Sequence, residues 1–375
     1  MKAIRINRLG RLRDEPHTGH NRWHPDIAPA LRVEPGEDIL LETRDAADGQ
    51  IRADMTVADL ARLDTKVGHP LTGPLYIEGA EPGDLLDVEF VDIQPQPYGW
   101  TRIRPGIGFL RDDFPDSHFL AHWHIDQGIA RSAQIPGVNI PCGAFMGTAG
   151  VAPSHEQLAR WSARESRLIA GGGLALAPDP QDAVPQTEPI ASTGLRTMPP
   201  RENGGNADVK QLTRGSVLQL PVAVPGALFS TGDAHFAQGD SECCVTAIEM
   251  GATAIVRFRL HKGLAARHDI RFPRFSHPGY FLPPEWAAPR RLIGTMGMPI
   301  HLDGSQAGED LTLAARNALR EMIKLLGERG YSREQAYVIC SVAVDLRISN
   351  AVDLPNVVVS ALLPEAIFDG VQTTR

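Results

Sequence analysis

The chain has 375 residues, 42% of them hydrophobic, so it can bury a large core and form two or three packed modules. A formal net charge of −8 without a basic stripe argues against a nucleic-acid partner. No run of about 18 apolar residues occurs, and the start of the chain lacks a signal-peptide pattern. We therefore expect a cytoplasmic protein with no membrane partner.

The first 95 residues are predicted to form short strands separated by turns. Two Glu-Pro-Gly turns, at 34–37 and 81–84, each precede an apolar run. This pattern favours an antiparallel sandwich or barrel. A short helix is predicted over 54–63, with Asp54 or Thr56 near its N-cap. The strands are predicted over 2–6, 31–33, 38–43, 75–78 and 85–93.

Histidines gather in two places. The segment 17–26 holds three in eight residues, which fits a metal cluster, a substrate-facing loop or a solvated turn. In the segment 118–124, His122 and His124 share a face if the backbone is extended. The alternative for this second segment is an amphipathic strand with Trp123 directed inward.

The region from about 98 to 215 is rich in Pro and Gly, and we expect it to be loop-rich. Its one helical candidate follows Ser154, which is well placed as an N-cap. A long irregular stretch inside a compact protein is usually functional or structurally constrained. The segment 202–208 closes this region with polar side chains on a flexible turn before a strand.

The central stretch 229–249 lies between two apolar runs and carries the densest polar chemistry of the chain. Asp233 and His235 are two residues apart, as are Asp240 and Glu242, so each pair shares a face in extended backbone. Three carboxylates and an imidazole suit a divalent metal or a hydrolytic acid/base set. A polar hairpin, with Asp and Gly in their turn roles, explains the same spacing.

The four cysteines are too few and too scattered for a disulfide framework, and none forms a Cys-x-x-Cys metal knuckle. We interpret Cys243 and Cys244 as buried thiols.

The last hundred residues change to an α/β style. The apolar spacing from 311 to 330 predicts an amphipathic helix, Ser332 is expected to cap a second helix, and 357–363 is predicted as a strand. We therefore divide the chain into an N-terminal β-sandwich region with long loops (1–170), a central β region that carries the site (171–265) and a C-terminal α/β region (266–375).

Six segments together resemble the acetamidase/formamidase family, and the match is close to its formamidases. They follow one another along nearly the whole chain, and their combination is specific although each alone is weak. One departure is Ser241-Glu-Cys-Cys, where the family more often has Gly-Glu-Val-Cys. The segments are 20–27, 69–84, 106–115, 145–147, 202–206 and 232–242.

The resemblance implies a mainly β fold, a jelly-roll-like β-sandwich with additional small β and C-terminal α/β parts, in a homo-oligomer. It also implies hydrolysis of short aliphatic amides, most simply formamide to formate and ammonia. A divalent metal, zinc first, is the implied cofactor, and no organic cofactor is needed.

On this basis we assign roles to nine side chains. A metal needs three or more ligands of the right type, with one position left open to water. Asp208, Asp233, His235 and Glu242 are expected to be those ligands, Glu78 the general base and acid, and His20 a catalytic group that orients the amide or the water. Trp23, Thr72 and Asn206 are expected to contact substrate.

Other functions fit less well. Neither a Gly- and Ser-rich nucleophile loop nor a Gly-x-Ser-x-Gly elbow is present, and Cys243 has no helix signal after it. A non-catalytic amide- or sugar-binding jelly-roll protein stays an alternative, although buried unpaired acids are costly without a metal or a proton to transfer. A related lactam-cleaving hydrolase is the other alternative.

Overall fold

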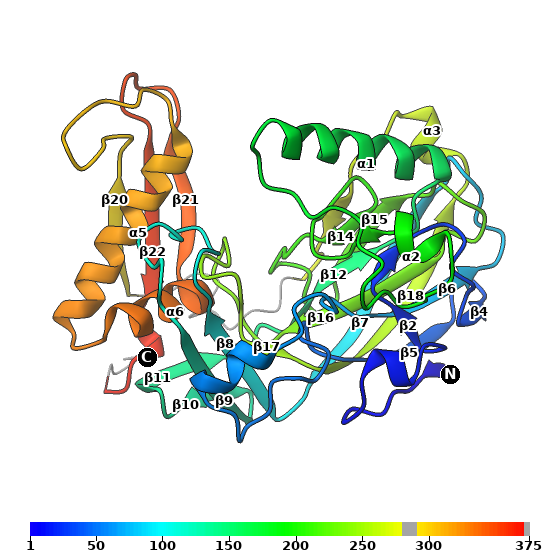
Figure 1. Ribbon diagram of the computed structural model, residues 1–375, viewed down its shortest axis with the longest axis horizontal. Helices are drawn as coiled ribbons and strands as arrows, with labels where there is room; N and C mark the ends of the chain where they lie inside the picture. Colours follow the sequence, from blue (N-terminus) through cyan, green and yellow to red (C-terminus); the bar gives the residue numbers. More distant parts are fainter. Residues whose placement is uncertain (280–290, 371–375) are drawn as a thin grey trace.

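The computed structural model describes residues 1–279 and 291–370, which fold around two large β-sheets (Figure 1). The smaller of the two has six strands and mixes segments from both halves of the chain. Its order is β1 (Lys2–Ile4), β5 (Asp38–Thr43), β18 (Ala252–His261), β7 (Leu85–Pro95), β15 (Val217–Pro221) and β19 (Arg274–Ser276).

The larger sheet has eleven strands and carries the central stretch. Its main path is β11 (Ile135–Pro141), β10 (Ile129–Ser132), β9 (Phe119–Asp126), β8 (Tyr98–Ile103), β17 (Glu249–Met250), β16 (Phe229–His235), β12 (Phe145–Gly150) and β14 (Gly204–Asn206). Strand β6 (Leu71–Ile77) joins β16 and also pairs with β2 (Gly19–His20) and β4 (Leu31–Val33).

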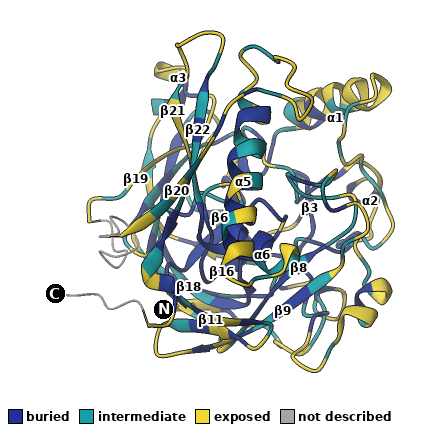
Figure 2. Ribbon diagram, turned by 90° about the vertical axis from the view of Figure 1, so that its left-hand side faces the viewer, coloured by how far each residue is buried: buried dark blue, intermediate teal, exposed yellow. Residues whose placement is uncertain are grey.

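The core lies between these two sheets. Burial alternates along β5 and β18, as expected for antiparallel strands with one face against apolar partners. Phe229 of β16 meets Phe258 of β18 across the interface, with ring centroids 5.3 Å apart. Strands β6 and β16 are buried along nearly their whole length, whereas helix α1 (His155–Ala170) is mostly exposed (Figure 2).

Helix α1 begins where the sequence predicts. The Ser154 side chain accepts a hydrogen bond from Gln157 N at 3.2 Å, which satisfies a free donor of the first turn. Its buried residues Leu158 and Trp161 pack on Trp23, from the two-stranded sheet of β3 (Arg22–Trp23) and β13 (Leu195–Arg196). The other short helices of the described residues are α2 (Ile190–Thr193), α3 (Leu264–Arg267) and the 3-10 helices Leu12–Asp14, Val57–Arg62 and, in the C-terminal part, Glu365–Ile367.

The C-terminal part is a separate three-stranded sheet with two helices, at the left of Figure 1. The sheet order is β20 (Leu292–Gly297), β22 (Val358–Pro364) and β21 (Asp345–Asn350). Helix α5 (Leu311–Glu328) packs on this sheet, and helix α6 (Arg333–Ala343) is buried along most of its length. The Ser332 cap predicted for α6 is confirmed, because its side chain accepts from Gln335 N.

Helix α6 connects the C-terminal part to the central stretch. The Tyr337 hydroxyl donates to Cys243 O and accepts from Leu110 N. The Ser341 hydroxyl donates to Thr246 O at 2.7 Å and accepts from Cys244 N at 3.1 Å. Hydrogen bonds from α6 therefore hold the segment that follows β16 in place.

The mainly β fold with a C-terminal α/β part is confirmed. The expectation of a loop-rich 98–215 is wrong for residues 98–150, where five strands occur. The prolines there lie in turns or bends and inside β11, at the outer edge of the sheet, where a missing donor costs little. The three-part division stays a prediction, and both large sheets take strands from before and after residue 171. None of the helices in the described ranges is long and apolar enough to span a bilayer.

Candidate active site

One row of side chains crosses the large sheet and defines the site. His235 of β16 is paired in register with Phe145 of β12 on one side and with Glu249 of β17 on the other. Glu249 is in turn paired with Trp100 of β8. Residues directly opposite in antiparallel strands point to the same face, so the imidazole and the Glu249 carboxylate lie next to each other.

Four carboxylates gather around His235 and form, with it, what we call the acidic cluster: Asp208, Asp233, His235, Glu242 and Glu249. From His235 Nε2 the distance is 3.3 Å to Glu249 Oε2, 3.5 Å to Asp233 Oδ1 and 3.8 Å to Glu242 Oε1. One ligand atom from each of Asp208, Asp233 and His235 also falls within 4.8 Å of the others. The sequence-predicted metal ligands are thus brought together.

The backbone is strained where it presents these acids. Asp208, Asp233 and Glu242 have φ values of 49°, 55° and 47°, in the left-handed region that side chains other than glycine seldom adopt. The positive φ of Asp233 interrupts the extended backbone of β16. Left-handed residues of this kind concentrate at functional sites, where the surrounding structure compensates for their cost.

A second set of hydrogen bonds orients the cluster. Gln238 Oε1 lies 2.9 Å from His235 Nδ1, while Gln238 Nε2 donates to Asp208 O at 2.9 Å. The contact assigns a proton to His235 Nδ1 and leaves Nε2 directed at the carboxylates. The Thr148 hydroxyl lies 2.6 Å from Asn206 Oδ1 and 3.2 Å from Asp233 Oδ2. Asn206 is therefore next to the cluster.

His69 completes the site from the residues just before β6. Its Nδ1 lies 3.0 Å from Asp233 Oδ2, and its backbone N–H donates to the Thr197 hydroxyl at 3.1 Å. Burial alone would lower the pKa of His69, but the charges of Asp233, Glu249 and Asp208 raise it to about 9. The imidazole therefore carries a proton in this electrostatic environment.

The acidic cluster holds more negative charge than its histidines can balance. Burial raises the pKa of Asp208 and Glu249, and that of Glu242 to about 8. Burial acts in the same direction on Asp233, yet His69 and His235 hold its pKa well below the ordinary value. For His235, burial lowers the pKa, and Glu249 and Asp233 outweigh burial and raise it. A positive charge placed between these groups would relieve the repulsion.

The cluster has the donor set and the free atoms of a divalent-metal site. Imidazole nitrogen and carboxylate oxygen are ligands that zinc accepts. Gly147 keeps the space open, since a Cβ there would lie 2.7 Å from Asp208 Oδ1 and 2.9 Å from His235 Cε1. Within the described residues, four buried atoms of the cluster have no hydrogen-bond partner: Asp208 Oδ1, Asp233 Oδ1, His235 Nε2 and Glu249 Oε2.

The structure does not bring Glu78 to this cluster. Glu78 follows the end of β6, whereas His69 precedes its start, a separation of roughly 25 Å at the rise of a strand. The Glu78 carboxylate pairs with Arg32 at 2.7 Å, and this bond lowers its pKa. A carboxylate paired with arginine is a poor base, so the geometry gives no support to Glu78 as the proton-transfer group.

His20, Trp23 and Thr72 have structural contacts in place of substrate contacts. Both ring nitrogens of His20 are engaged, Nδ1 with Arg22 O at 2.6 Å and Nε2 with the Ser230 hydroxyl at 2.7 Å. Trp23 is buried under α1, and the Thr72 hydroxyl donates to Glu42 O. Elsewhere in the histidine-rich segment, Asp26 lies 3.0 Å from His155 Nε2.

The second histidine segment is the amphipathic strand β9. Trp123 points inward and donates to the Thr101 hydroxyl, while His122 contacts Tyr98 and Met55 O.

Sequence reasoning missed Glu249 and His69. Glu249 stands inside an apolar run, Ala247-Ile-Glu-Met, and an acid in such a run was the available signal. His69 lies in the Gly68-His-Pro segment, where nothing in the local sequence marks it as a site residue. It comes close to Asp233 only because β6, which follows His69, pairs with β16.

A small cavity adjoins the cluster. Its volume is about 80 Å³, on the order of a few water molecules. His69 and Glu249 line it, together with Trp100, Arg102 and Cys244. Through Glu249 the cluster therefore borders a volume that a small ligand could fill.

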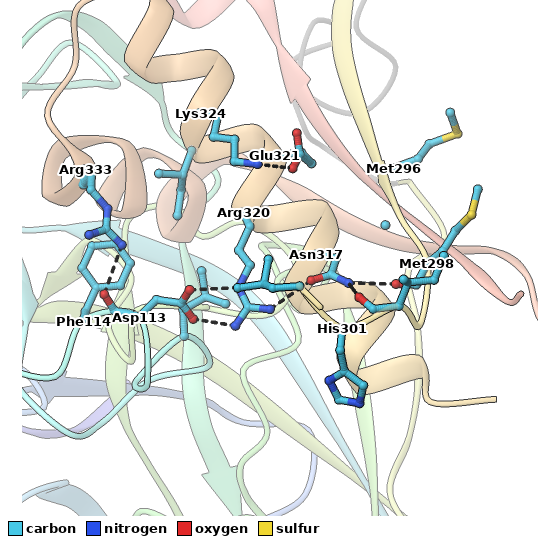
Figure 3. A pocket seen from close by; sticks show the side chains of 15 residues that line it. Asp113, Phe114, Met296, Met298, His301, Asn317, Arg320, Glu321, Lys324 and Arg333 are labelled. Atoms are coloured by element: carbon cyan, nitrogen blue, oxygen red, sulfur yellow. Dashed lines mark hydrogen bonds and ion pairs between the residues drawn. The ribbon is translucent and has the colours of Figure 1, made fainter. Parts of the chain in front are cut away.

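A larger cavity of about 680 Å³ lies in the C-terminal part, away from the cluster (Figure 3). Its charged side chains pair with one another: Arg320 contacts Asp113 at 2.8 Å and Lys324 contacts Glu321 at 2.5 Å. Because its charges are already paired, we place the active site at the smaller cavity.

Comparisons with known proteins show what this chain is similar to. The model of the Acetamidase/Formamidase family matches residues 5–370. An acetamidase of Mycolicibacterium smegmatis is 38% identical over 88% of this chain and 86% of its own. A formamidase of Methylophilus methylotrophus is 35% identical over 93% and 89%. The structure of a gamma lactamase from Delftia acidovorans superposes with a TM-score of 0.92 at 37% identity, covering 98% and 94%.

The buried His20 generates a prediction about acid stability. Burial lowers its pKa to about 4, against 6.5 for a free histidine, and the hydrogen bond to Arg22 O opposes this only in part. Below pH 6.5 the unfolded chain therefore binds a proton that the folded chain rejects, so stability is full above pH 6.5 and falls towards pH 4. The loss amounts to about 3 kcal/mol.

Denaturant unfolding of wild type and His20→Gln at pH 7, 5.5 and 4.5 measures this. The wild type should lose more unfolding free energy than the variant over that range. Equal losses in both proteins would show that His20 titrates normally.

Proposed function

The chain belongs to the acetamidase/formamidase family and is an amidohydrolase, and we propose that it hydrolyses short linear amides, formamide foremost, at the acidic cluster. The observation that carries this proposal is the position of the 80 Å³ cavity, with His69 and Glu249 in its wall. A formamide molecule has three non-hydrogen atoms and suits so small a volume. The reaction adds water across the C–N bond and yields a carboxylate and ammonia.

We propose that Asp208, Asp233, His235, Glu242 and Glu249 hold a divalent cation, zinc first. Support comes from the four unpartnered buried atoms and from the positive φ of three of the acids. A cation bound there would polarise the amide carbonyl and lower the pKa of water to roughly 7. Gln238 would keep His235 in the tautomer that a ligand needs.

His69 replaces Glu78 in our proposal for proton transfer. It is the one imidazole that both contacts the cluster, through Asp233, and lines the cavity within the described residues. The amide nitrogen is a poor leaving group until it is protonated and can depart as ammonia, so a protonated imidazole beside that nitrogen would favour C–N cleavage. Asp233 would orient the ring and stabilise its charge.

A lactam is the second candidate substrate, because a structural relative is a gamma lactamase. A five-membered lactam ring has twice as many non-hydrogen atoms as formamide. The small cavity therefore favours the linear amide.

We further propose a cytoplasmic homo-oligomer. All four cysteines are described and are free thiols, as is usual in a reducing compartment. On the C-terminal sheet, Leu292 and Met296 of β20 are 49% and 66% exposed, which suits burial against a second copy. The net charge of −8 gives no support to a nucleic-acid partner.

Metal content and turnover should fall together when a ligand is removed. We expect His235→Ala and Asp233→Ala to lose the bound metal and ammonia release. His69→Gln should keep the metal and lose roughly 10²- to 10⁴-fold in kcat, the usual contribution of a proton-transfer group. Elemental analysis beside an ammonia-release assay separates these two classes of variant.

Glu78→Gln is the matched control, since it removes a carboxylate outside the cluster and should keep both metal and turnover. A fully active wild type without a stoichiometric divalent ion, at a rate that chelators leave unchanged, would contradict the ligand assignment.

Formamide should be hydrolysed more efficiently than acetamide, and acetamide more efficiently than propionamide. Each added methylene must fit the small cavity, and one methylene changes discrimination by about 1–3 kcal/mol. The values of kcat/KM for the three amides and for a γ-lactam test this order. Equal efficiency on propionamide would show that the cavity does not set the substrate size.

Cys244→Ser and Cys243→Ala should keep most of the turnover. Cys244 lines the cavity, but burial raises its pKa to about 11, so the thiolate that a nucleophile requires is scarce at neutral pH. Burial also raises the pKa of Cys243. Ammonia release by the folded variants measures this, and an acyl-enzyme trapped on either cysteine would establish covalent catalysis instead.

A further inference from the structure

Two arginines face the cavity without a protein partner for their charge. Arg102 and Arg104 both line it, together with His69 and Glu249 of the site. Neither guanidinium makes a hydrogen bond or ion pair with any residue in 1–279 or 291–370, although most other half-buried arginines of the chain do. An arginine near Glu249 that has no ion-pair partner in these ranges calls for a physical reason.

The register of the sheet fixes where Arg102 lies. It follows Trp100 by two residues in β8, so both side chains point to the same face as Glu249. Arg102 Cζ lies 5.7 Å from the centroid of the Trp100 ring, and its backbone N–H donates to the Thr246 hydroxyl. The guanidinium is thus held over the cavity wall by a strand and an aromatic ring.

The groups around Arg102 leave the N–H donors of its guanidinium available to a ligand. Burial and the like charge of Arg104 lower its pKa, whereas Glu249 and Asp45 act in the opposite direction without a hydrogen bond. Glu249 is turned away, because its Oε1 accepts from Ala247 N at 3.0 Å and its Oε2 faces His235. Five N–H donors in a plane match the two oxygens of a carboxylate.

We propose that Arg102, with Arg104 beside it, forms a binding subsite for a small carboxylate in this cavity, and that the ligand is the carboxylate product of amide hydrolysis. The identity of the ligand rests on the proposed function, whereas the subsite rests on the arginines alone. An anion there would pair the two cations and would lie next to the cluster that releases it. The 80 Å³ volume admits formate and excludes long acids.

Formate is the probe for the subsite. Calorimetric titration into the metal-loaded protein should give a Kd at least tenfold weaker for Arg102→Met than for wild type. Arg102→Lys keeps the positive charge but loses the planar pair of N–H donors, so its Kd should lie between those of wild type and Arg102→Met. Arg271→Met, the same change on a side chain that is 72% exposed and pairs only with Asp269, should bind as wild type does. An unchanged Kd in Arg102→Met would overturn the proposal.

Thermal unfolding provides a second measurement. Without formate, Arg102→Met should be at least as stable as wild type, because it removes a half-buried charge that has no partner. Added formate should raise the Tm of wild type more than that of Arg102→Met. In His235→Ala, which should not hydrolyse amides, acetate should bind at least tenfold more tightly than acetamide, its neutral counterpart of similar size. Equal binding of these two ligands would also overturn the subsite.

Two further comparisons separate the source of the carboxylate from the reaction itself. If oxamate is hydrolysed in preference to the neutral oxamide, and Arg102→Met abolishes that preference, the subsite stands but takes a carboxylate carried by the substrate. His235→Ala should lose ammonia release yet still bind formate through Arg102. Ammonia release that survives in His235→Ala would refute the cluster as the catalytic site and leave the formate result intact.

Discussion

The constraint on which this structure depends is the burial of four carboxylates around one imidazole at the end of β16. Two unit charges 4 Å apart interact by about 4 kcal/mol near a protein surface, so four acids at such distances oppose folding. The fold holds them there through a strained backbone at Asp208, Asp233 and Glu242 and through paired strands that carry His235 and Glu249. Such an arrangement is retained when function requires it.

The C-terminal α/β part explains how the strained segment stays in place. Helix α6 bonds to the backbone of 239–246 from behind, and Gly239 leaves no room for a Cβ, which would lie 2.3 Å from Val344 O. At the start of β21, Asp345 accepts from Asp240 N and pairs with Lys210, two residues after Asp208. The segments that carry Asp208 and Glu242 are thus both bound to Asp345, outside the sandwich. The C-terminal part therefore helps to hold the segments of the acidic cluster in position.

Side chains of both charges line the cavity. Glu249 of the cluster is among them, and so are Arg102 and Arg104. A neutral amide enters such a space without a large electrostatic cost, whereas its hydrolysis creates an anion and a cation. Arg102 and Arg104 then offer the carboxylate product oppositely charged neighbours. The arrangement suits a reaction that separates charge.

The sequence by itself determined the local features of this protein: the capped helices after Ser154 and Ser332, the strands around the Pro-Gly turns, and the segments that supply Asp208, Asp233, His235 and Glu242. These follow from periodicity, capping and short spacings, which act within a few residues. Only the tertiary structure decided that Glu249 and His69 join the cluster, that Glu78 pairs with Arg32 far from it, and that Arg102 faces the cavity. Strand register made those choices, because it brings together residues about 150 or more positions apart that no local pattern connects.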